Sequence, residues 1–240
     1  MIYYTGDIHG MPWNIISFCK KVKTTKDDTI VILGDVGANY YGDSRDTECK
    51  RQLSKVNPTV LCIHGNHEIR PSSIPTYKTK EWNGGTVWFE ETYPNLLFAK
   101  DGEIFDIEGI RHLVIGGAYS VDKHYRLARG YGWWADEQPS DEIKAYVEQQ
   151  IANRDFDVIL SHTCPLKYEP VEMFLTMIDQ STVDKSTEIW LDGIEGRVKY
   201  KDWFCGHWHT NKRIDKMHFL YGDFELSSIL KEQEFIDEKD

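Results

Sequence analysis

The chain has no surplus of positive charge. Among its 240 residues, 28 are Lys or Arg and 39 are Asp or Glu, which gives a formal net charge of −11. Non-specific binding to nucleic acid depends on basic surface. We therefore expect extended nucleic acid not to be a partner. A phosphorylated substrate is still compatible with this composition, because a bound metal can supply positive charge locally.

Long hydrophobic runs and closely paired cysteines are also absent. No apolar run approaches the roughly 20 residues that a membrane-spanning helix needs, and the first residues lack the basic head and apolar segment of a secretory signal. The five cysteines are widely spaced, without a C-x-x-C pair, which suits a reducing compartment. We expect a cytoplasmic protein with no membrane partner. The sequence does not indicate an oligomeric state.

Two common catalytic motifs are missing from the chain, the G-x-S-x-G elbow and the P-loop. What it does contain is typical of a globular protein: 40% hydrophobic residues, with eight Trp, thirteen Tyr and ten Phe, the opposite of a disordered composition. We expect a single domain over residues 1–240. Its charge-rich end, residues 231–240, is expected to be a solvated tail or a terminal helix.

Strand and helix patterns alternate in the first seventy residues. Strands are expected at residues 2–4, 29–33 and 59–63, with helices near 12–22 and 46–56, and this alternation predicts a parallel sheet. Short strands are then expected at residues 86–89, 96–99, 103–107 and 110–115. Because Asp101-Gly102 is a hairpin turn signal, we expect these four to be antiparallel and to form the second half of a sandwich.

The second half of the chain contains an aromatic, charged segment without a periodic pattern. At residues 119–139 it is too long for an ordinary connection, and long loops tend to be functional, so we interpret residues 118–140 as a lid-like insertion. A helix is expected at 140–153, a strand at 156–160, and a further helix beginning at 184 or 186. Strands at 203–205 and 214–221 complete the sheet.

Polar side chains follow several of these strands, where ligand sites of α/β sheets lie. They are Asp7, His9, Asp35, Asn66, His67, His162, His207 and His209. Carboxylate and imidazole groups together favour first-row transition metals. Eight groups are too many for one ion and fit two ions that share a carboxylate. Two ions about 3.5–4 Å apart can activate a water and stabilise an in-line displacement at phosphorus.

Five motifs occur in a fixed order between residues 6 and 209. They are Gly6-Asp7-Ile8-His9-Gly10, Gly34-Asp35-Val36-Gly37, Gly65-Asn66-His67-Glu68, Ser161-His162 and Gly206-His207-Trp208-His209. In this set and order, the chain resembles the calcineurin-like metallophosphoesterase family. The resemblance implies an α/β (α+β) fold, a four-layer α-β-β-α sandwich whose mixed sheets are flanked by helices. It also implies a hydrolase that cleaves a phosphoester with a hydroxide bridging two metal ions.

The resemblance also implies a role for each motif residue. Asp7, His9 and His209 would hold one metal, Asn66, His162 and His207 the other, and Asp35 would bridge them. His67 would face the substrate, where a proton-donating imidazole suits general acid chemistry, and Asn66 would help to neutralise the phosphoryl oxygens. The expected cofactors are two divalent ions, Mn²⁺ first, with Fe, Zn, Ni or Co as alternatives.

The substrate is less constrained than the chemistry. In the serine/threonine phosphoprotein phosphatase branch the second motif continues with an Asp and an Arg, and Ala38 and Asn39 stand there instead. We therefore expect a small phosphorylated substrate or nucleotide, with monoester and diester both open. Arg126 and Arg129 are candidates to hold phosphate oxygens, against the alternative of a packed lid with solvated charges. A phosphoprotein phosphatase-like enzyme and a non-catalytic metal-binding scaffold are the alternative functions.

Overall fold

Parallel strands connected by helices form the first part of the fold. In the computed structural model, which describes residues 1–229, β1 (Ile2–Thr5), β2 (Thr29–Ile32) and β3 (Thr59–Cys62) lie side by side. The helices α1 (Trp13–Val22) and α2 (Ser44–Leu53) connect them. All of β2 is buried, as expected for a parallel strand covered on both faces. The charge-rich end expected at residues 231–240 lies outside the described residues.

Two mixed sheets make up the centre of the molecule. The first has the order β13-β1-β2-β3-β6-β5-β4 and the second has the order β11-β12-β10-β9-β8-β7. The remaining strands are β4 (Lys78–Trp82), β5 (Gly85–Phe89), β6 (Leu96–Ala99), β7 (Ile104–Ile107), β8 (Ile110–Ile115), β9 (Val158–Ser161), β10 (Asp202–Cys205), β11 (Lys212–Ile214), β12 (Met217–Phe219) and β13 (Phe224–Glu225).

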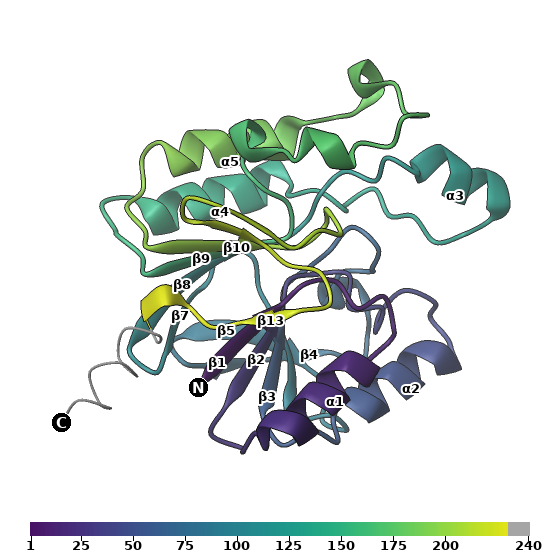
Figure 1. Cartoon of the computed structure of the whole chain (residues 1–240). Coiled ribbons are helices and arrows are strands. Elements are labelled where there is room, and N and C mark those ends of the chain that lie inside the picture. The colour runs from purple at the N-terminus through teal and green to yellow at the C-terminus, as the bar shows by residue number, and fades with distance from the viewer. Residues whose placement is uncertain (230–240) are drawn as a thin grey trace.

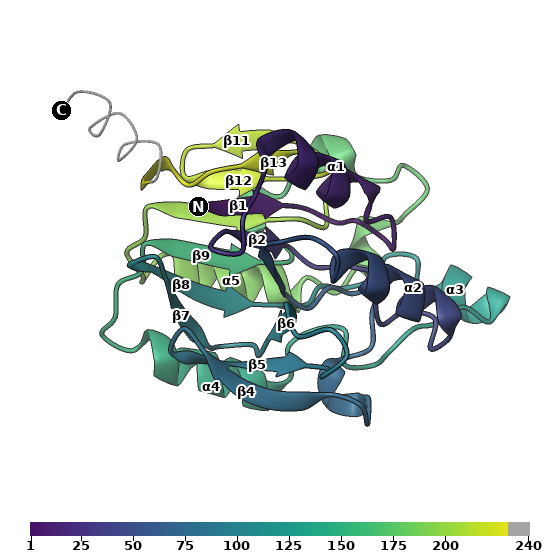
Figure 2. The same ribbon diagram turned by 90° about the horizontal axis from the view of Figure 1, so that it is seen from below.

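Helices cover the outer face of each sheet. Figure 1 shows α4 (Asp141–Ile151) and α5 (Ser186–Glu195) over the second sheet, with α1 and α2 below the first. Figure 2 shows α1 and α2 in front of the first sheet, seen from below. This is the expected four-layer arrangement of two mixed sheets flanked by helices, and the predicted fold class is confirmed.

The middle strands differ from the sequence-based expectation. Residues 96–99 and 103–107 were expected to form a hairpin in the second half of the sandwich. Instead β6 pairs with β3 and β5 in the first sheet, whereas β7 pairs with β8 in the second. The turn at Asp101-Gly102 therefore carries the chain between sheets. The Asp101 carboxylate holds it there, since it accepts hydrogen bonds from Gly116 N (2.8 Å) and Arg70 Nη1 (2.5 Å).

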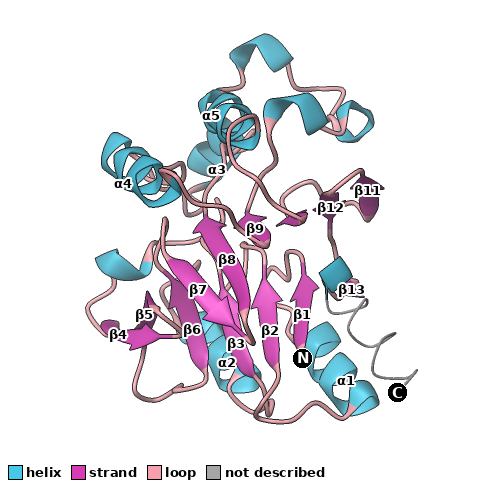
Figure 3. Cartoon of the chain, turned by 90° about the vertical axis from the view of Figure 1, so that its left-hand side faces the viewer, coloured by secondary structure: helices cyan, strands magenta, loops and turns pink. Residues whose placement is uncertain are grey.

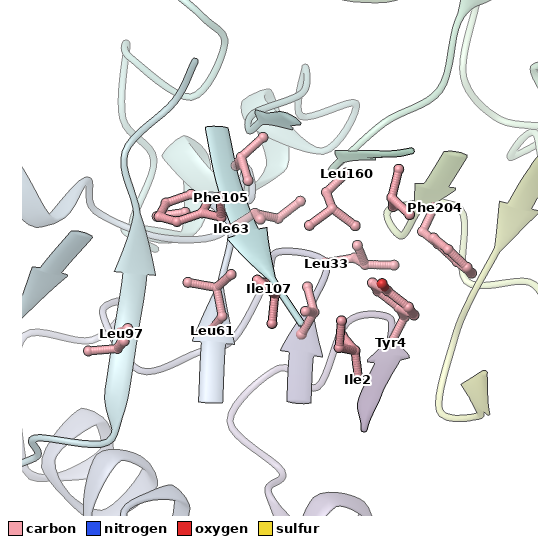
Figure 4. Packing of buried hydrophobic residues seen from close by; sticks show 14 of the residues in the cluster. Ile2, Tyr4, Leu33, Leu61, Ile63, Leu97, Phe105, Ile107, Leu160 and Phe204 are labelled. Atoms are coloured by element: carbon pink, nitrogen blue, oxygen red, sulfur yellow. The ribbon is translucent and has the colours of Figure 1, made fainter. Parts of the chain in front are cut away.

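The main core lies between the two sheets. Figure 4 shows side chains of β1, β2 and β3 meeting those of β7, β9 and β10, and Tyr4 stacks on Phe204 with ring centroids 4.1 Å apart. Two further buried clusters lie under α1 and α2 and under α4 and α5. Side chains packed from both sheets fix the relative positions of the strands, and therefore of the loops at their carboxyl ends.

The connections around the second sheet are only partly irregular. The insertion at 118–140 contains a short helix, α3 (Lys123–Arg129), which extends away from the sheets in Figure 1. Between β9 and α5 the chain makes three 3₁₀ turns, η2 (Leu166–Tyr168), η3 (Val171–Met173) and η4 (Gln180–Thr182); a fourth, η1 (Pro71–Ser73), follows β3. Within residues 1–229, no helix has the length and apolar character required to cross a bilayer.

A buried ion pair joins β10, β12 and the last described turn. The Asp202 carboxylate lies 3.2 Å from His218 Nε2 and accepts hydrogen bonds from Ser227 Oγ and Ser228 N, both 2.7 Å. Burial alone would raise the pKa of Asp202, but these hydrogen bonds lower it. Burial alone would lower the pKa of His218, but Asp202 and Glu225 raise it.

These pKa shifts predict how the stability contribution of the pair depends on pH. The Asp202 contribution is complete above the unfolded pKa of about 3.9 and is lost as the pH falls below it, whereas the His218 contribution is complete below about 6.5 and is lost as the pH rises through its raised folded pKa. Asp202→Asn should therefore lower the free energy of unfolding most near about pH 5.5, by about 3 kcal/mol. Urea unfolding at about pH 5.5 and pH 9 checks this. A decrease of equal size at both pH values would contradict it.

Candidate metal centre

The loops after five parallel strands meet at one edge of the paired sheets. Figure 3 shows β1 and β2 pointing the same way, and β9 and β10 are also parallel. Because parallel strands end at the same edge, their following loops are neighbours. The side chains at this edge are Asp7 and His9 after β1, Asp35 after β2, Asn66 and His67 after β3, His162 after β9, and His207 and His209 after β10.

One group of ligand atoms comes from the first and last motifs. His9 Nε2 and His209 Nε2 lie 2.9 Å apart, and His209 Nε2 lies 3.2 Å from Asp7 Oδ2. The third distance, from His9 Nε2 to Asp7 Oδ2, is 3.8 Å. Two imidazole nitrogens and a carboxylate oxygen therefore converge on one point, as a three-residue ligand set requires.

A second group forms around the buried His162. Its Nε2 lies 2.8 Å from Asn66 Oδ1 and 3.5 Å from Asp35 Oδ1, and His207 Nδ1 lies 3.0 Å from the same amide oxygen. The other ring nitrogen of His162, Nδ1, contacts the carbonyl oxygen of Leu33 at 2.7 Å. This contact fixes the tautomer that leaves Nε2 unprotonated, as a metal ligand must be.

Asp35 lies between the two groups. Its Oδ2 is 4.0 Å from His9 Nε2, while its Oδ1 is 3.5 Å from His162 Nε2 and accepts the backbone N–H of His67 at 2.8 Å. Ligand atoms of His9, Asp35 and His67 also lie close together. The same is true of ligand atoms of Asp7, Asp35 and His162. The geometry thus makes both Asp7 and Asp35 available to more than one ion.

The donor set fits divalent transition metals. Asp7 Oδ2 is buried and has no hydrogen-bond partner among the described residues, although two imidazoles face it. Burial lowers the pKa of His207 well below its usual value, which favours the neutral ring that ligates metal. At Asp35 the effect of burial is outweighed by the charges of His162, His67 and His9, and its pKa is lowered, which favours the ionised carboxylate.

The backbone around the site is strained and closely packed. His9, Asp35, His207 and His209 all have positive φ, between 45° and 63°, a conformation that costs non-glycine residues energy and is concentrated at functional sites. A Cβ atom at Gly65 would lie 2.1 Å from Asp35 Oδ1 and 2.2 Å from Asp35 N. Only glycine therefore allows the two loops to approach each other at this point.

His67 is surrounded by groups from the insertion. Its Nε2 lies 3.8 Å from Asp122 Oδ1, and its ring stacks on Tyr40 with centroids 6.1 Å apart. Burial lowers the pKa of His67, while the charge of Asp35 opposes that effect. The sequence indicated no acidic partner for His67, because Ala38 and Asn39 stand where the phosphoprotein phosphatase branch has an Asp and an Arg. Asp122 supplies a carboxylate from a different part of the chain.

The two arginines of the insertion have different positions. Arg126 is 1% exposed and donates to Ser120 Oγ (2.9 Å) and to the carbonyl oxygen of Gly132 (2.7 Å). Ser120 Oγ in turn accepts a hydrogen bond from Asn66 Nδ2 at 2.9 Å, so Arg126 supports the ligand loop indirectly. The structure does not bring Arg129 into this group, since its guanidinium lies over the Tyr125 ring.

Glu68 and Ser120 are structural residues of the site that the sequence did not reveal. Glu68 Oε1 accepts the backbone N–H of Gly65 at 2.7 Å and closes the turn that carries Asn66 and His67. Burial raises the pKa of Glu68 to about 8. The position of Glu68 within its motif could have indicated this role. Ser120 and Asp122 lie outside the motifs, and only the structure shows that they are close to the site.

The comparisons with known proteins agree with the geometry. A family model described as calcineurin-like phosphoesterase matches residues 1–211, and a search of curated proteins gave no match. The solved structure of TT1561 from Thermus thermophilus is similar, with a TM-score of 0.52, 12% identity, and 92% of this chain and 87% of that chain covered. A phosphopantetheinyl hydrolase from Mycobacterium tuberculosis has a TM-score of 0.42 and 13% identity, with the same coverage.

At 12% identity, the similarity to TT1561 indicates a shared fold and nothing finer. The family match has more weight, because it covers residues 1–211 of a 240-residue chain and includes all five motifs. The residues of those motifs are the ones that converge at the strand ends. The chain therefore belongs to the calcineurin-like phosphoesterase family.

Proposed function

We propose that the protein hydrolyses a phosphoester with the help of two divalent metal ions. The observation that carries the proposal is the convergence of imidazole, carboxylate and amide groups from five strand ends on adjoining points. Asp7, His9 and His209 would hold one ion, Asn66, His162 and His207 the other, and Asp35 both. When bound, the ions would make water nucleophilic near neutral pH and offset the negative charge of the phosphoryl group.

His67 is the residue that we assign to the leaving group. Its backbone N–H donates to Asp35 Oδ1, which fixes the imidazole beside the ligand groups, and its side chain faces the pocket that opens from them. A protonated imidazole in this position donates its proton to the departing alkoxide oxygen. Asp122 lies 3.8 Å from His67 Nε2, and its charge opposes the burial that lowers the pKa of His67.

Asp122→Asn is expected to lower kcat for phenyl phosphate by about tenfold, part of the total contribution of a general acid. The decrease should be smaller for 2,4-dinitrophenyl phosphate, because its leaving group departs without a proton. Steady-state kinetics with both esters measure the difference. Asp136→Asn makes the same charge change at a half-exposed side chain of the insertion and should have little effect. An equal decrease for both esters would exclude Asp122 as the partner of His67.

The direct test of the proposed function is hydrolysis of p-nitrophenyl phosphate and bis(p-nitrophenyl) phosphate in the presence of Mn²⁺, our first choice of metal. Turnover of either ester supports the proposal and shows whether monoesters or diesters are preferred. No turnover with Mn²⁺, Fe²⁺, Zn²⁺, Ni²⁺ or Co²⁺ would support the alternative of a metal-binding scaffold. We further propose a cytoplasmic enzyme whose single domain carries residues 118–140 as a lid.

The phosphoprotein phosphatase alternative gains no support from the positions after Asp35. Ala38 is fully buried, and Asn39 is buried with its Oδ1 accepting a hydrogen bond from Tyr77 at 2.9 Å. Neither position offers a group to a phosphorylated side chain. A small phosphorylated molecule therefore remains our proposed substrate.

A further inference from the structure

A pocket of about 370 Å³ extends from the candidate metal ligands. Its lining includes Asp35, Asn66 and His67 at the strand ends, and Tyr119 and Asp122 of the insertion. The chain between η2 and α5 supplies further lining residues. In Figure 1 this green segment lies at the same end of the molecule as α3. The pocket is therefore placed to receive the part of a substrate that lies beyond its phosphoryl group.

One wall of the pocket, contributed by the chain between η2 and α5, is apolar. It is formed mainly by Met173, Phe174, Leu175, Ile178 and Val183. Phe174 stacks on Trp208, the residue between His207 and His209, with ring centroids 5.7 Å apart. Met173 is 38% exposed and Leu175 is 55% exposed, so part of their apolar surface is available to a ligand. Burying such surface against an apolar part of a ligand is favourable.

The charges in the pocket disfavour a second anionic group. Among the described residues that line it, Lys185 is the one Lys or Arg, and its amino group already donates to Glu169 Oε2 at 2.7 Å. A nucleoside polyphosphate has several phosphates, and proteins bind those with Arg, Lys or helix N-termini. Among the described residues, the pocket lining therefore has no unpaired Lys or Arg that could bind an additional phosphate beyond the reach of the metals.

Glu188 adds a buried polar group to the same pocket. It is 4% exposed, and its Oε2 has no hydrogen-bond partner among the described residues. A buried carboxylate oxygen without a donor costs free energy, and a donor supplied by a ligand would remove that cost. The pocket thus combines an apolar wall with one acceptor that lacks a donor.

We propose that this pocket selects phosphoesters of apolar alcohols whose far end carries a neutral or cationic hydrogen-bond donor, such as an amine or a hydroxyl. The inference rests on the proposed function and narrows its substrate class. Within the sequence-based expectation of a small phosphorylated substrate or nucleotide, it favours an ester with a single phosphate over a nucleoside polyphosphate. The phosphoryl group lies at the metal ligands, the carbon chain lies on Phe174 and Leu175, and the donor reaches Glu188.

Alkyl phosphates test the apolar wall without changing the acidity of the leaving alcohol. With Mn²⁺ present, kcat/KM for hexyl phosphate should exceed that for ethyl phosphate by about tenfold or more, since each buried methylene is favourable. Phe174→Ala and Leu175→Ala should each lower this ratio several-fold. Met177→Ala is the matched control, because Met177 is 87% exposed on the same segment and does not line the pocket.

Derivatives of hexyl phosphate with a charged far end test the charge preference of the pocket. 6-Aminohexyl phosphate should be hydrolysed with a higher kcat/KM than hexane-1,6-diyl bisphosphate, by about tenfold, because the second phosphate finds no free cation. Glu188→Gln should abolish the preference for the amine over plain hexyl phosphate. Melting temperatures of all variants verify that they fold.

The outcomes separate the two proposals. Equal kcat/KM for ethyl and hexyl phosphate, or equal use of the amine and the bisphosphate, would overturn the pocket assignment and leave the phosphoesterase intact. No hydrolysis of any ester would overturn the proposed function. Calorimetric binding of hexylphosphonate and ethylphosphonate then tests the pocket alone. Tighter binding of the hexyl compound, lost in Phe174→Ala, supports the assignment, and equal binding of both contradicts it.

Discussion

Asp35→Asn should lower phosphoester hydrolysis by about a thousandfold or more while leaving the fold intact. The Asp35 carboxylate has one oxygen toward each ligand group, Oδ1 toward His162 and Oδ2 toward His9. An amide in its place is neutral and presents one oxygen and one NH₂ group. Both ligand groups therefore lose an anionic ligand, and one of them also loses its oxygen ligand. Metal ions contribute several kcal/mol to stabilising the transition state, and each 1.4 kcal/mol corresponds to a tenfold change.

The same variant provides a readout that does not depend on turnover. A metal that binds only the folded protein stabilises it, by about 2.7 kcal/mol when its concentration is 100 times the dissociation constant. Mn²⁺ should therefore raise the melting temperature of the wild-type protein and raise that of Asp35→Asn much less. In metal-free buffer the variant should be somewhat less stable, because the lowered pKa of Asp35 means that the folded protein favours its carboxylate, so each Mn²⁺ shift is taken from that protein's own metal-free melting temperature. A variant with normal hydrolysis and a normal Mn²⁺ shift would exclude Asp35 from the metal centre.

His67→Ala should lower kcat for phenyl phosphate by about a hundredfold to ten-thousandfold, the contribution typical of a general acid. The hydrogen bond from residue 67 to Asp35 Oδ1 comes from the backbone, so the substitution leaves the ligand loop in place. Metal content should accordingly be unchanged. The decrease should be far smaller for 2,4-dinitrophenyl phosphate, whose leaving group is already a good one.

Metal analysis of the His67 variant also decides between two interpretations of the geometry. His67 lies close enough to His9 and Asp35 to be a third ligand of one ion, whereas resemblance to the family assigns it to the substrate. If His67→Ala binds about one ion fewer than the wild-type protein, the ligand interpretation is correct. An unchanged metal content with reduced kcat supports the general acid.

The parallel sheet and the gathering of the site could be predicted because both follow from local patterns, whereas the four-layer arrangement was implied by resemblance to the family. Buried strands are recognised from apolar runs, and parallel strands place their following loops at one edge. Asp7, Asp35, His162 and His207 therefore come together although they are far apart in the chain. His9 and His209, from the first and last motifs, likewise face one point together with Asp7.

Sequence patterns could not predict features that depend on contacts between distant segments. The turn at Asp101-Gly102 has the signal of a hairpin, but its carboxylate binds Gly116 and Arg70, and the chain changes sheets there. Asp122 lies in an insertion without a motif, and its distance from His67 is a tertiary property. The apolar residues between η2 and α5 have no helical or strand period, so their position along the pocket could not be inferred.

The most direct test of the central claim is the metal content of the protein compared with its activity. Manganese should be added stepwise to chelator-treated protein while bound metal and p-nitrophenyl phosphate hydrolysis are measured on the same samples. Two ligand groups that share Asp35 predict negligible activity without metal and full activity at about two ions per chain. Full activity after complete removal of metal, or saturation of binding below about one ion per chain, would contradict the account.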